Sequence, residues 1–141
     1  MKEFNLLVPM AGRGQRFINE GYKVPKQLLY VKDKQLIDIS LESVDMSQCN
    51  LIFVVRDDQI SNYQIDKILE KKYGDDIKIV VTDGLTDGSV CSCLLAEDYI
   101  DNDIPLIIHT LDIQFFPVLD PNSLFVDGED DLLLTFKSNS T

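Results

Sequence analysis

Four short apolar runs, separated by longer amphipathic stretches, limit the possible folds of this chain more than any other feature. They cover Phe4–Pro9, Leu51–Val55, Ile77–Val81 and Pro105–His109. Runs of about five residues that are apolar at nearly every position are typical of strands buried on both faces of a parallel sheet. The sequence therefore predicts such a sheet, to which Asp131–Phe136 is expected to add a fifth strand.

Helices are predicted between these strands. Residues 35–44 carry apolar side chains at the spacing of an amphipathic helix. Asp57 or Asp58 is expected to cap a second helix that ends near Gly74, and Ser89 is expected to cap a third. The third helix is expected to pack through Val90, Cys93, Leu94, Ala96 or Glu97, and Ile100. This alternation indicates a three-layer α/β fold with a mainly parallel, Rossmann-like sheet and mainly right-handed crossovers.

The chain is predicted to form one domain over residues 1–141, because it contains no internal repeat, low-complexity tract or clear linker. If its first four strands take the doubly wound order 3-2-1-4, the first and the fourth are neighbours at the point where the winding reverses. The loops after these two strands would then flank one crevice. Ligands of open α/β sheets bind in such a crevice.

The composition is that of a soluble globular protein, with 45% hydrophobic and 26% charged residues. No apolar run approaches the roughly 18 to 20 residues that span a bilayer, and the first residues lack a signal-peptide pattern. A net charge of −11 argues against nonspecific binding to nucleic acids. We therefore expect a cytoplasmic protein with no nucleic-acid partner and no membrane partner.

The distribution of charge is more informative than its sum. Residues 1–34 carry seven Lys and Arg side chains against three Asp and Glu, whereas the remaining 107 residues carry six against 21. The basic minority therefore gathers in the part of the chain that contains two closely spaced glycines, Gly12 and Gly14. Such a cluster suits an anionic ligand, although chance clustering on a solvated face is the alternative.

Several other polar residues have a structural interpretation. Cys49, Cys91 and Cys93 are odd in number and suggest no disulfide framework, and no second Cys or His pair completes a metal site, so buried or half-buried free thiols are expected. His109, the single histidine, is interpreted as a packed strand residue rather than a catalyst. The Asp57-Asp58 pair is better explained by helix capping than by catalysis, and the acidic residues 127–131 by an exposed turn.

A glycine turn, Gly12-Arg-Gly-Gln-Arg-Phe17, follows the first predicted strand. Glycines let backbone N–H groups approach phosphate oxygens closely, and Arg and Lys side chains neutralise the phosphate charge. A dinucleotide fingerprint would need a third glycine in place of Phe17 and a continuing helix, which Gly21 and Pro25 make short or absent. A Walker loop would need Gly-Lys-Ser/Thr. The turn therefore indicates a polyphosphate site of another type.

Two neighbouring motifs make the interpretation more specific. The turn Ala11–Phe17, then Pro25-Lys-Gln-Leu-Leu29, then Lys32-Asp-Lys-Gln-Leu-Ile37, resemble three motifs of the sugar-phosphate nucleotidyltransferase family. Members of that family typically carry Gly-Ser/Thr-Arg-Phe, Pro-Lys-Pro-Leu-Ile and Gly-Lys-Pro-Met-Ile. Gly21-Tyr22 ahead of the second motif is similar to a branch linked to capsule and surface polysaccharide synthesis.

The resemblance continues downstream and covers nearly all of the chain in collinear order. Gly88–Ala96 resembles the family's small-residue helix start beneath the base and the acceptor. Pro105–Asp112 resembles its Pro-Leu-Leu-Ile-x-Asn-x-Asp motif, which ends in a metal-binding aspartate. The resemblance implies a GT-A-like nucleotidyltransferase fold.

The chain also departs from the family pattern. Gln15 replaces the usual Ser or Thr and removes a hydroxyl near the phosphates. Gln27 replaces the second proline, and Pro-Lys-Gln is closer to the methylerythritol-phosphate cytidylyltransferases. Family members are commonly much longer, and their second half generally supplies much of the acceptor pocket and a further metal-binding acid. We therefore expect this chain to lack that C-terminal portion.

The resemblance implies a Mg²⁺-dependent enzyme that transfers a nucleoside monophosphate from a nucleoside triphosphate to a phosphorylated sugar or related small phosphate, releasing pyrophosphate. CTP is favoured, with UTP and dTTP as alternatives. By the same resemblance, Arg16 and Lys26 are catalytic and Asp112 holds Mg²⁺. The nucleotide-binding residues would be Met10, Ala11, Gly12, Arg13, Gly14, Gln15, Asp83, Asp87, Gly88 and Ser89.

A non-catalytic or truncated nucleotide-binding regulatory module is the alternative function. Its support is the shortness of the chain relative to the family and the replacement at Gln15. The sequence leaves open the base, the acceptor and whether the protein forms a homo-oligomer.

Overall fold

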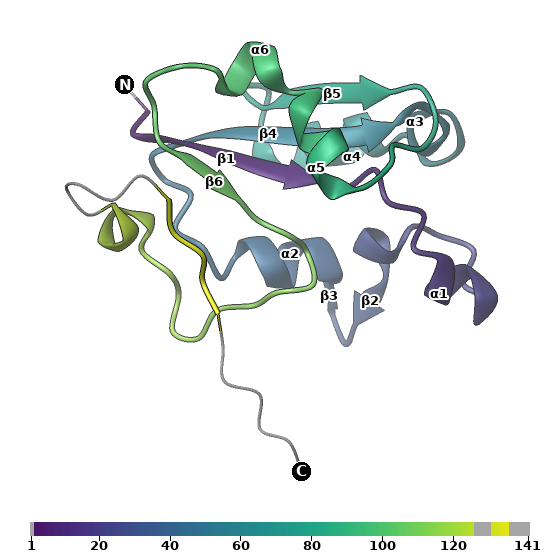
Figure 1. Cartoon of the computed structure of the whole chain (residues 1–141). Coiled ribbons are helices and arrows are strands. Elements are labelled where there is room, and N and C mark those ends of the chain that lie inside the picture. The colour runs from purple at the N-terminus through teal and green to yellow at the C-terminus, as the bar shows by residue number, and fades with distance from the viewer. Residues whose placement is uncertain (1, 126–130, 136–141) are drawn as a thin grey trace.

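The centre of the molecule is a four-stranded parallel sheet. The computed structural model describes residues 2–125 and 131–135. The strands are β1 (Phe4–Pro9), β4 (Cys49–Arg56), β5 (Lys78–Thr82) and β6 (Leu106–Ile108), and their order in the sheet is β5-β4-β1-β6 (Figure 1). This is the order 3-2-1-4 predicted for the first four strands, so β1 and β6 are neighbours.

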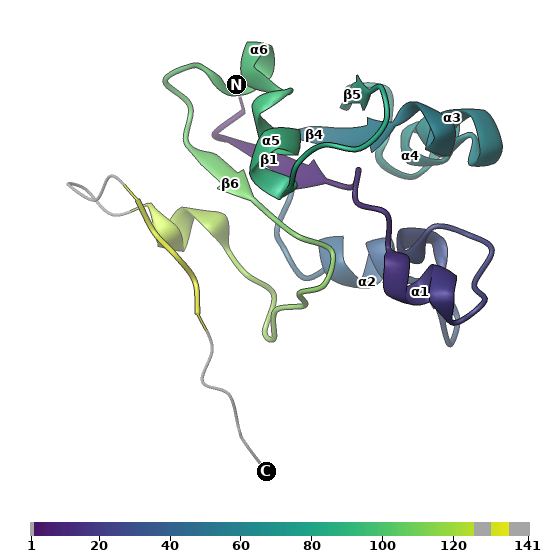
Figure 2. The same ribbon diagram turned by 45° about the vertical axis from the view of Figure 1, so that its right-hand side comes forward.

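The central strand β1 is buried on both faces because helices cover the sheet from two sides. Leu6 and Val8 belong to a large apolar cluster with α2 (Leu36–Leu41) and α4 (Ile65–Tyr73). Leu7 points to the opposite face, where it packs with residues from α5 (Ser89–Leu94). Figures 1 and 2 show α2 and α5 on opposite sides of β1. The structure therefore confirms the predicted three-layer α/β fold.

The predicted second helix is divided into two. α3 (Asp57–Tyr63) ends where Gln64 adopts a left-handed conformation with φ 52°, and α4 then begins and ends before Gly74. The N-cap of α3 is Arg56, whose backbone N–H donates to the Gln59 side chain at 2.9 Å. The prediction that Asp57 or Asp58 is the cap was therefore wrong. Both residues lie in the first turn, where a negative charge interacts favourably with the helix dipole.

The predicted third helix is also shorter than expected. α5 has Gly88 as its N-cap, so Ser89 is the first helical residue and not the cap. The chain then turns before α6 (Glu97–Ile100). Because so short a helix turns only one side toward the sheet, Cys93 is buried, whereas Val90 and Leu94 are exposed, contrary to the prediction.

Short elements fill the segment between β1 and α2. α1 (Gln15–Asn19) has a single turn, as Gly21 and Pro25 led us to expect, and η1 (Lys26–Leu28) follows. β2 (Tyr30–Val31) and β3 (Lys34–Gln35) then form an antiparallel hairpin that the sequence analysis did not predict.

After β6, the described residues contain one short element, η2 (Pro121–Leu124). Residues 131–135 have no regular secondary structure and are exposed, so the fifth strand predicted at Asp131–Phe136 is not formed in its described part. Phe136 lies outside the described residues, as do residues 127–130 of the acidic stretch, whose last member Asp131 is exposed.

The three cysteines are free thiols. Burial raises the pKa of Cys49 to about 11 and also raises the pKa of Cys93, so both thiols are protonated at neutral pH. Cys91 is exposed, and the prediction of burial was wrong for this residue, which lies on the side of α5 away from the sheet. Within the described part of the chain, no helix is long and apolar enough to cross a bilayer.

Candidate functional site

The chain leaves the end of β1 through residues 10–14, which we call the glycine loop. Met10 and Ala11 are buried, and the loop becomes exposed at Gly12 and Arg13. Gly14 has φ 60°, a left-handed conformation that glycine adopts without the steric cost of a Cβ atom, and it caps α1. The buried strand and the positive φ together fix where the loop leaves the sheet.

A pocket of about 460 Å³ lies at the carboxyl ends of β1 and β6, and we call it the loop pocket. Its walls come from the glycine loop, the start of η1, the segment that leads into α5 and the segment that follows β6. It is lined by Pro9, Met10, Ala11, Gly12, Arg13, Lys26, Gln27, Leu85, Thr86, Gly88, Ser89, Ser92, Thr110, Leu111 and Asp112. The structure thus confirms that the loops after the first and fourth strands flank one crevice.

Two predicted site residues meet in this pocket although they lie 86 positions apart in the sequence. Lys26 Nζ donates to Asp112 Oδ1 at 2.6 Å, and the two side chains are 31% and 68% exposed. Both groups are therefore open to solvent, where an ion pair contributes little to stability. A ligand that offers an anion to Lys26 and a cation to Asp112 can replace this contact at low cost.

The segment that carries Asp112 is anchored by His109. This histidine is buried one residue after β6, as its interpretation as a packed residue predicted. Its backbone N–H donates to Leu7 O at 2.9 Å, and its Nε2 lies 2.8 Å from Ser40 Oγ. Because Ser40 Oγ donates to Ile113 O at 2.6 Å, it accepts from His109 Nε2–H. Burial lowers the pKa of His109, which favours the neutral ring, and in this ring the Nε2–H tautomer makes the hydrogen bond to Ser40.

Gln27 contributes a polar group that has no partner. The residue lines the loop pocket and is only 4% exposed. Among the described residues, no acceptor lies within hydrogen-bonding distance of its buried Nε2. An unpaired buried amide costs about 1–3 kcal/mol, which makes Gln27 a candidate for contact with a bound ligand.

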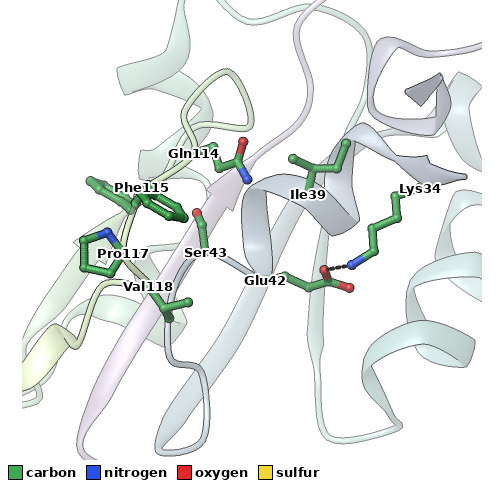
Figure 3. A pocket seen from close by; sticks show the side chains of 9 residues that line it. Lys34, Ile39, Glu42, Ser43, Gln114, Phe115, Pro117 and Val118 are labelled. Atoms are coloured by element: carbon green, nitrogen blue, oxygen red, sulfur yellow. Dashed lines mark hydrogen bonds and ion pairs between the residues drawn. The ribbon is translucent and has the colours of Figure 1, made fainter. Parts of the chain in front are cut away.

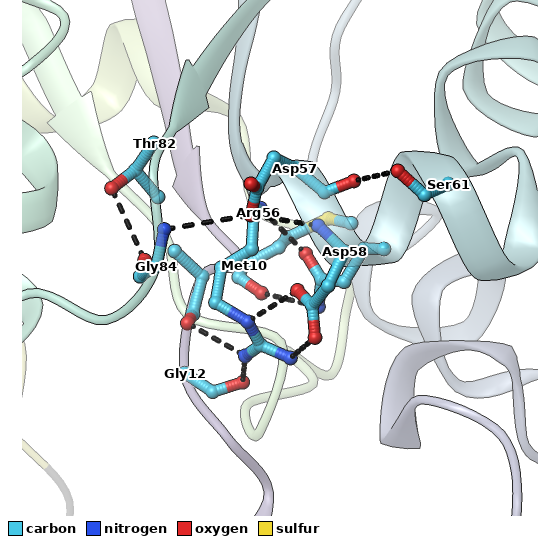
Figure 4. Close-up of polar contacts among 10 residues, drawn as sticks. Met10, Gly12, Arg56, Asp57, Asp58, Ser61, Thr82 and Gly84 are labelled. Carbon is cyan, nitrogen blue, oxygen red and sulfur yellow. Dashed lines mark hydrogen bonds and ion pairs between the residues drawn. The ribbon is translucent and has the colours of Figure 1, made fainter.

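The opposite side of the glycine loop is held by residues at the start of α3 (Figure 4). Arg56 Nη1 donates to the carbonyl oxygens of Ala11 at 2.9 Å and Gly12 at 2.7 Å. Gln59 Nε2 donates to Met10 O at 3.1 Å. Sequence reasoning missed both residues, because the patterns of β4 and α3 do not show which backbone atoms they will reach.

The structure brings together most of the predicted site. Lys26 and Asp112 line the loop pocket with six of the predicted nucleotide-binding residues, namely Met10, Ala11, Gly12, Arg13, Gly88 and Ser89. Arg16, Gly14, Gln15, Asp83 and Asp87 do not line it. Gln15 Nε2 instead donates to Asn19 Oδ1 at 2.8 Å within α1. The roles of all these residues stay predictions.

Several lining residues were not predicted. Gln27 was noticed only as a departure from the family pattern, and Thr86, Ser92 and Thr110 were not singled out. Thr86 Oγ1 and Ser92 Oγ lie 2.6 Å apart and place two hydroxyls in the wall opposite the glycine loop. Thr86 lies in the polar run of residues 82–88 that leads into α5, and this run is the signal that could have found it, whereas Ser92 lies within α5 itself.

The residues present fit a divalent cation only in part. Within residues 2–125 and 131–135, no group of three or more His, Cys, Asp or Glu side chains is placed to hold a metal ion. Among the described residues, Asp112 is the single acidic one that lines the loop pocket. Mg²⁺ is commonly held by one or two carboxylates together with substrate phosphates and waters, so Asp112 suits a cation that arrives with a phosphate ligand.

A second pocket of about 370 Å³ lies between α2 and the segment after β6 (Figure 3). Its lining includes Ile39 and Ser43 from α2 and its extension, and Phe115 and Val118 from the other side. Lys34 and Glu42 form an ion pair at its edge. No residue of the predicted site lines this pocket, and the loop pocket is the candidate functional site.

Comparison with known structures supports the fold. The chain is similar to the nucleoside-diphosphate-sugar pyrophosphorylase from Vibrio cholerae RC9, with a TM-score of 0.64 and 21% identity over 76% of this chain and 47% of that one. It is also similar to a UDP-glucose pyrophosphorylase complexed with UDP-glucose, with a TM-score of 0.56 and 22% identity over 79% and 46% of the two chains. An apo UDP-glucose pyrophosphorylase is similar with a TM-score of 0.52 and 21% identity, over 77% of this chain and 47% of that one.

The chain therefore has the fold of these nucleotidyltransferases, as the sequence predicted, and spans about half the length of the solved structures it matches. No model of a protein family matches the chain. No curated protein matches it either.

Proposed function

We propose that this chain forms the nucleotide-binding part of a nucleotidyltransferase that acts on a sugar phosphate. The observation that carries the proposal is the meeting of Lys26 and Asp112 at 2.6 Å in a pocket whose facing wall is the glycine loop. An ammonium group, a carboxylate and a glycine-containing turn in one crevice suit a polyphosphate with its metal ion. The shared fold with pyrophosphorylases agrees with this assignment.

The proposed reaction is an in-line transfer at the α-phosphorus of a nucleoside triphosphate. A phosphate oxygen of the acceptor forms a bond to this phosphorus, the bond to the bridging β-phosphate oxygen breaks, and its electron pair leaves with pyrophosphate. Both reactants are anions, so the protein's main tasks are positioning and charge neutralisation.

Each residue of the site has a task in this proposal. Backbone N–H groups of the glycine loop and the Arg13 side chain bind phosphate oxygens. Lys26 leaves Asp112 and stabilises the charge that develops around the α-phosphate. Asp112 holds Mg²⁺, which neutralises phosphate charge when bound. Gln27 donates to an oxygen of the bound ligand. Gly88 and Ser89, with the Thr86 and Ser92 hydroxyls, line the part of the pocket where base and ribose contacts are proposed.

Three finer assignments rest on the sequence alone. CTP is the proposed donor, because Pro25-Lys-Gln27 is similar to the cytidylyltransferase motif, with UTP and dTTP as alternatives. A role in capsule or surface polysaccharide synthesis is proposed from Gly21-Tyr22. Arg16 is proposed to face the β- and γ-phosphates, although it does not line the loop pocket.

Release of pyrophosphate tests the proposal. The chain is incubated with Mg²⁺, each of CTP, UTP, dTTP and ATP, and a panel of sugar 1-phosphates, with Lys26→Met as the inactive control. Release that requires both substrates and is lost in the control supports the enzyme. A non-catalytic nucleotide-binding module is the second candidate, favoured by the 47% coverage of the matched pyrophosphorylase. Saturable binding of a triphosphate without release for any acceptor identifies that module and contradicts the enzyme.

A further inference from the structure

The carbonyl groups of residues 10–12 in the glycine loop are all held from the same side. Three consecutive carbonyl oxygens, those of Met10, Ala11 and Gly12, accept hydrogen bonds from the start of α3 (Figure 4). Arg56 serves two of them through a single nitrogen, Nη1, and Gln59 serves the third. These contacts fix the orientation of three successive peptide planes.

The orientation of the carbonyls determines the orientation of the N–H groups. In a trans peptide the C=O and the following N–H point in opposite directions. The N–H groups of Ala11, Gly12 and Arg13 therefore point away from α3, and all three residues line the loop pocket. Among the described residues, none of these N–H groups has a hydrogen-bond acceptor. Three successive free N–H groups on one side of a turn form a concavity that binds anions.

Arg56 is itself held in a fixed orientation. Its Nε and Nη2 donate to the two carboxylate oxygens of Asp58 at 2.7 and 3.1 Å, which leaves Nη1 for the loop. The same hydrogen bonds hold the pKa of the Asp58 carboxyl below its usual value. The Arg56 side chain is 13% exposed and does not line the pocket. A lysine has one nitrogen and could not bind Asp58 and both carbonyls with this planar geometry.

We infer that Arg56 is a positioning residue that turns the N–H groups of the glycine loop toward a bound polyphosphate. Its charge is matched by Asp58, so it acts through the loop and not as a phosphate ligand. The identity of the polyphosphate as a nucleoside triphosphate rests on the proposed function, whereas the orientation of the loop does not.

A test that is independent of turnover uses inorganic pyrophosphate as the probe. Backbone amide signals of residues 11–13 are followed by nuclear magnetic resonance in the ¹⁵N-labelled full chain during titration. In the wild type these three signals should shift with a common dissociation constant. In Arg56→Met that constant should rise roughly tenfold or more, since displacements near 1 Å at a binding site carry such costs. In Arg56→Lys, which keeps the charge but not the planar geometry, the constant should rise by a smaller factor.

The control variant is Lys72→Met. It breaks an ion pair with Asp38 at 2.7 Å, whose side chains are 25% and 22% exposed, and neither residue lines the loop pocket. It should lower the melting temperature without changing the pyrophosphate constant. If it weakens binding as much as Arg56→Met does, the effect is general destabilisation and the inference is overturned.

Steady-state kinetics separate positioning from a purely structural role. The Arg56 variants should raise the KM for the nucleotide by roughly the same factor as the pyrophosphate constant, while the KM for the sugar phosphate stays within about twofold. A fall in kcat with an unchanged nucleotide KM would overturn the inference.

The outcomes distinguish the inference from the proposed function. Pyrophosphate binding at residues 11–13 that depends on Arg56, without transfer by the wild type, supports the inference and refutes the enzyme. Wild-type transfer with equal pyrophosphate binding in all Arg56 variants supports the enzyme and overturns the inference. Wild-type amide signals that do not respond to pyrophosphate overturn the inference whether or not the protein is active.

Discussion

Two buried glutamines lie on opposite sides of the glycine loop and differ in one respect. Gln59 is 1% exposed, and both ends of its side-chain amide are bonded, one to Arg56 N and the other to Met10 O. Gln27 is 4% exposed, lines the loop pocket and, within the described part of the chain, leaves its Nε2 without a partner. The fold supplies hydrogen-bond partners for both ends of the Gln59 amide, whereas the Gln27 amide keeps an unused donor that a ligand could engage.

The two ion pairs next to the loop show the same contrast. Arg56 and Asp58 are joined by two hydrogen bonds, and the arginine is largely shielded from solvent. Lys26 and Asp112 are joined by one hydrogen bond in the open pocket. The contacts on the α3 side of the loop therefore hold one fixed geometry, whereas the ion pair on the pocket side can be replaced by contacts with a ligand. Substitutions on the α3 side should cost stability and, at Arg56, should also weaken phosphate binding through the loop, whereas substitutions on the pocket side should cost binding or catalysis with little loss of stability.

The largest expected effect is that of Lys26→Met. It removes the side chain proposed to stabilise charge at the α-phosphate, and loss of such a group costs on the order of 10²–10³ in kcat. The melting temperature should stay within a few degrees of the wild type, because exposed ion pairs contribute at most about 1 kcal/mol. Pyrophosphate release and thermal unfolding are measured on the same preparation. Unfolding of this variant at room temperature would assign Lys26 a structural role.

Asp112→Asn should have the next largest effect. The variant keeps the size of the side chain and loses the charge that is proposed to hold Mg²⁺. We expect activity to fall by about 10² and the midpoint of the Mg²⁺ titration to rise, as is typical when a metal ligand is weakened. Glu42→Gln, which breaks the exposed Lys34–Glu42 pair away from the loop pocket, is the matched control. A Mg²⁺ titration identical to that of the wild type would remove Asp112 from the metal site.

Replacing each glutamine by methionine tests the comparison directly. Gln59→Met leaves Arg56 N and Met10 O without their partner and should lower the free energy of unfolding by about 1–3 kcal/mol. Gln27→Met removes an unpaired donor, so stability should be unchanged or raised by about 1 kcal/mol, while triphosphate affinity falls roughly tenfold. Urea unfolding and calorimetric titration with each nucleotide provide the two measurements. Equal destabilisation by both variants would show that Gln27 is an ordinary core residue.

The smallest expected effect concerns His109, a buried polar group that the fold satisfies through Ser40. Its pKa in the folded chain lies below the usual 6.5, so the unfolded chain binds its proton first as the pH falls. Its contribution to stability is therefore complete above pH 6.5 and is lost as the pH falls from there through the folded pKa. Urea unfolding at about pH 8 and pH 5 should show a smaller pH dependence in His109→Gln than in the wild type. An unchanged pH dependence would exclude this role.

The architecture could be predicted because it follows from local patterns. The apolar runs that became β1, β4, β5 and β6 carry their burial in the sequence, and known winding rules gave their order. Helix ends were less predictable. Gln64 interrupts the second helix and Gly88 replaces Ser89 as a cap, because tertiary packing decided between alternatives that the local sequence left nearly equal.

The site could be predicted only in part for a related reason. Lys26 and Asp112 belong to recognisable motifs, so their segments could be placed at one crevice. Arg56 reaches Ala11 O across 45 positions and Gln59 reaches Met10 O across 49, and no local pattern specifies such pairings. The prediction of a fifth strand was wrong because a local pattern does not guarantee a long-range partner. Residues 131–135 are mostly apolar, but no strand is paired with them among the described residues.

The contact between Lys26 and Asp112 has a consequence for selectivity among ligands. While the two groups neutralise each other, a free anion must take Lys26 from its carboxylate, and a free cation must take Asp112 from its ammonium group. Either competitor alone leaves one charge of the pair without a counterion. A metal–triphosphate complex offers both replacements at once. On the proposed function, the pocket therefore favours the metal–triphosphate complex over inorganic phosphate or free Mg²⁺ alone, by at most the ~1 kcal/mol that an exposed ion pair contributes.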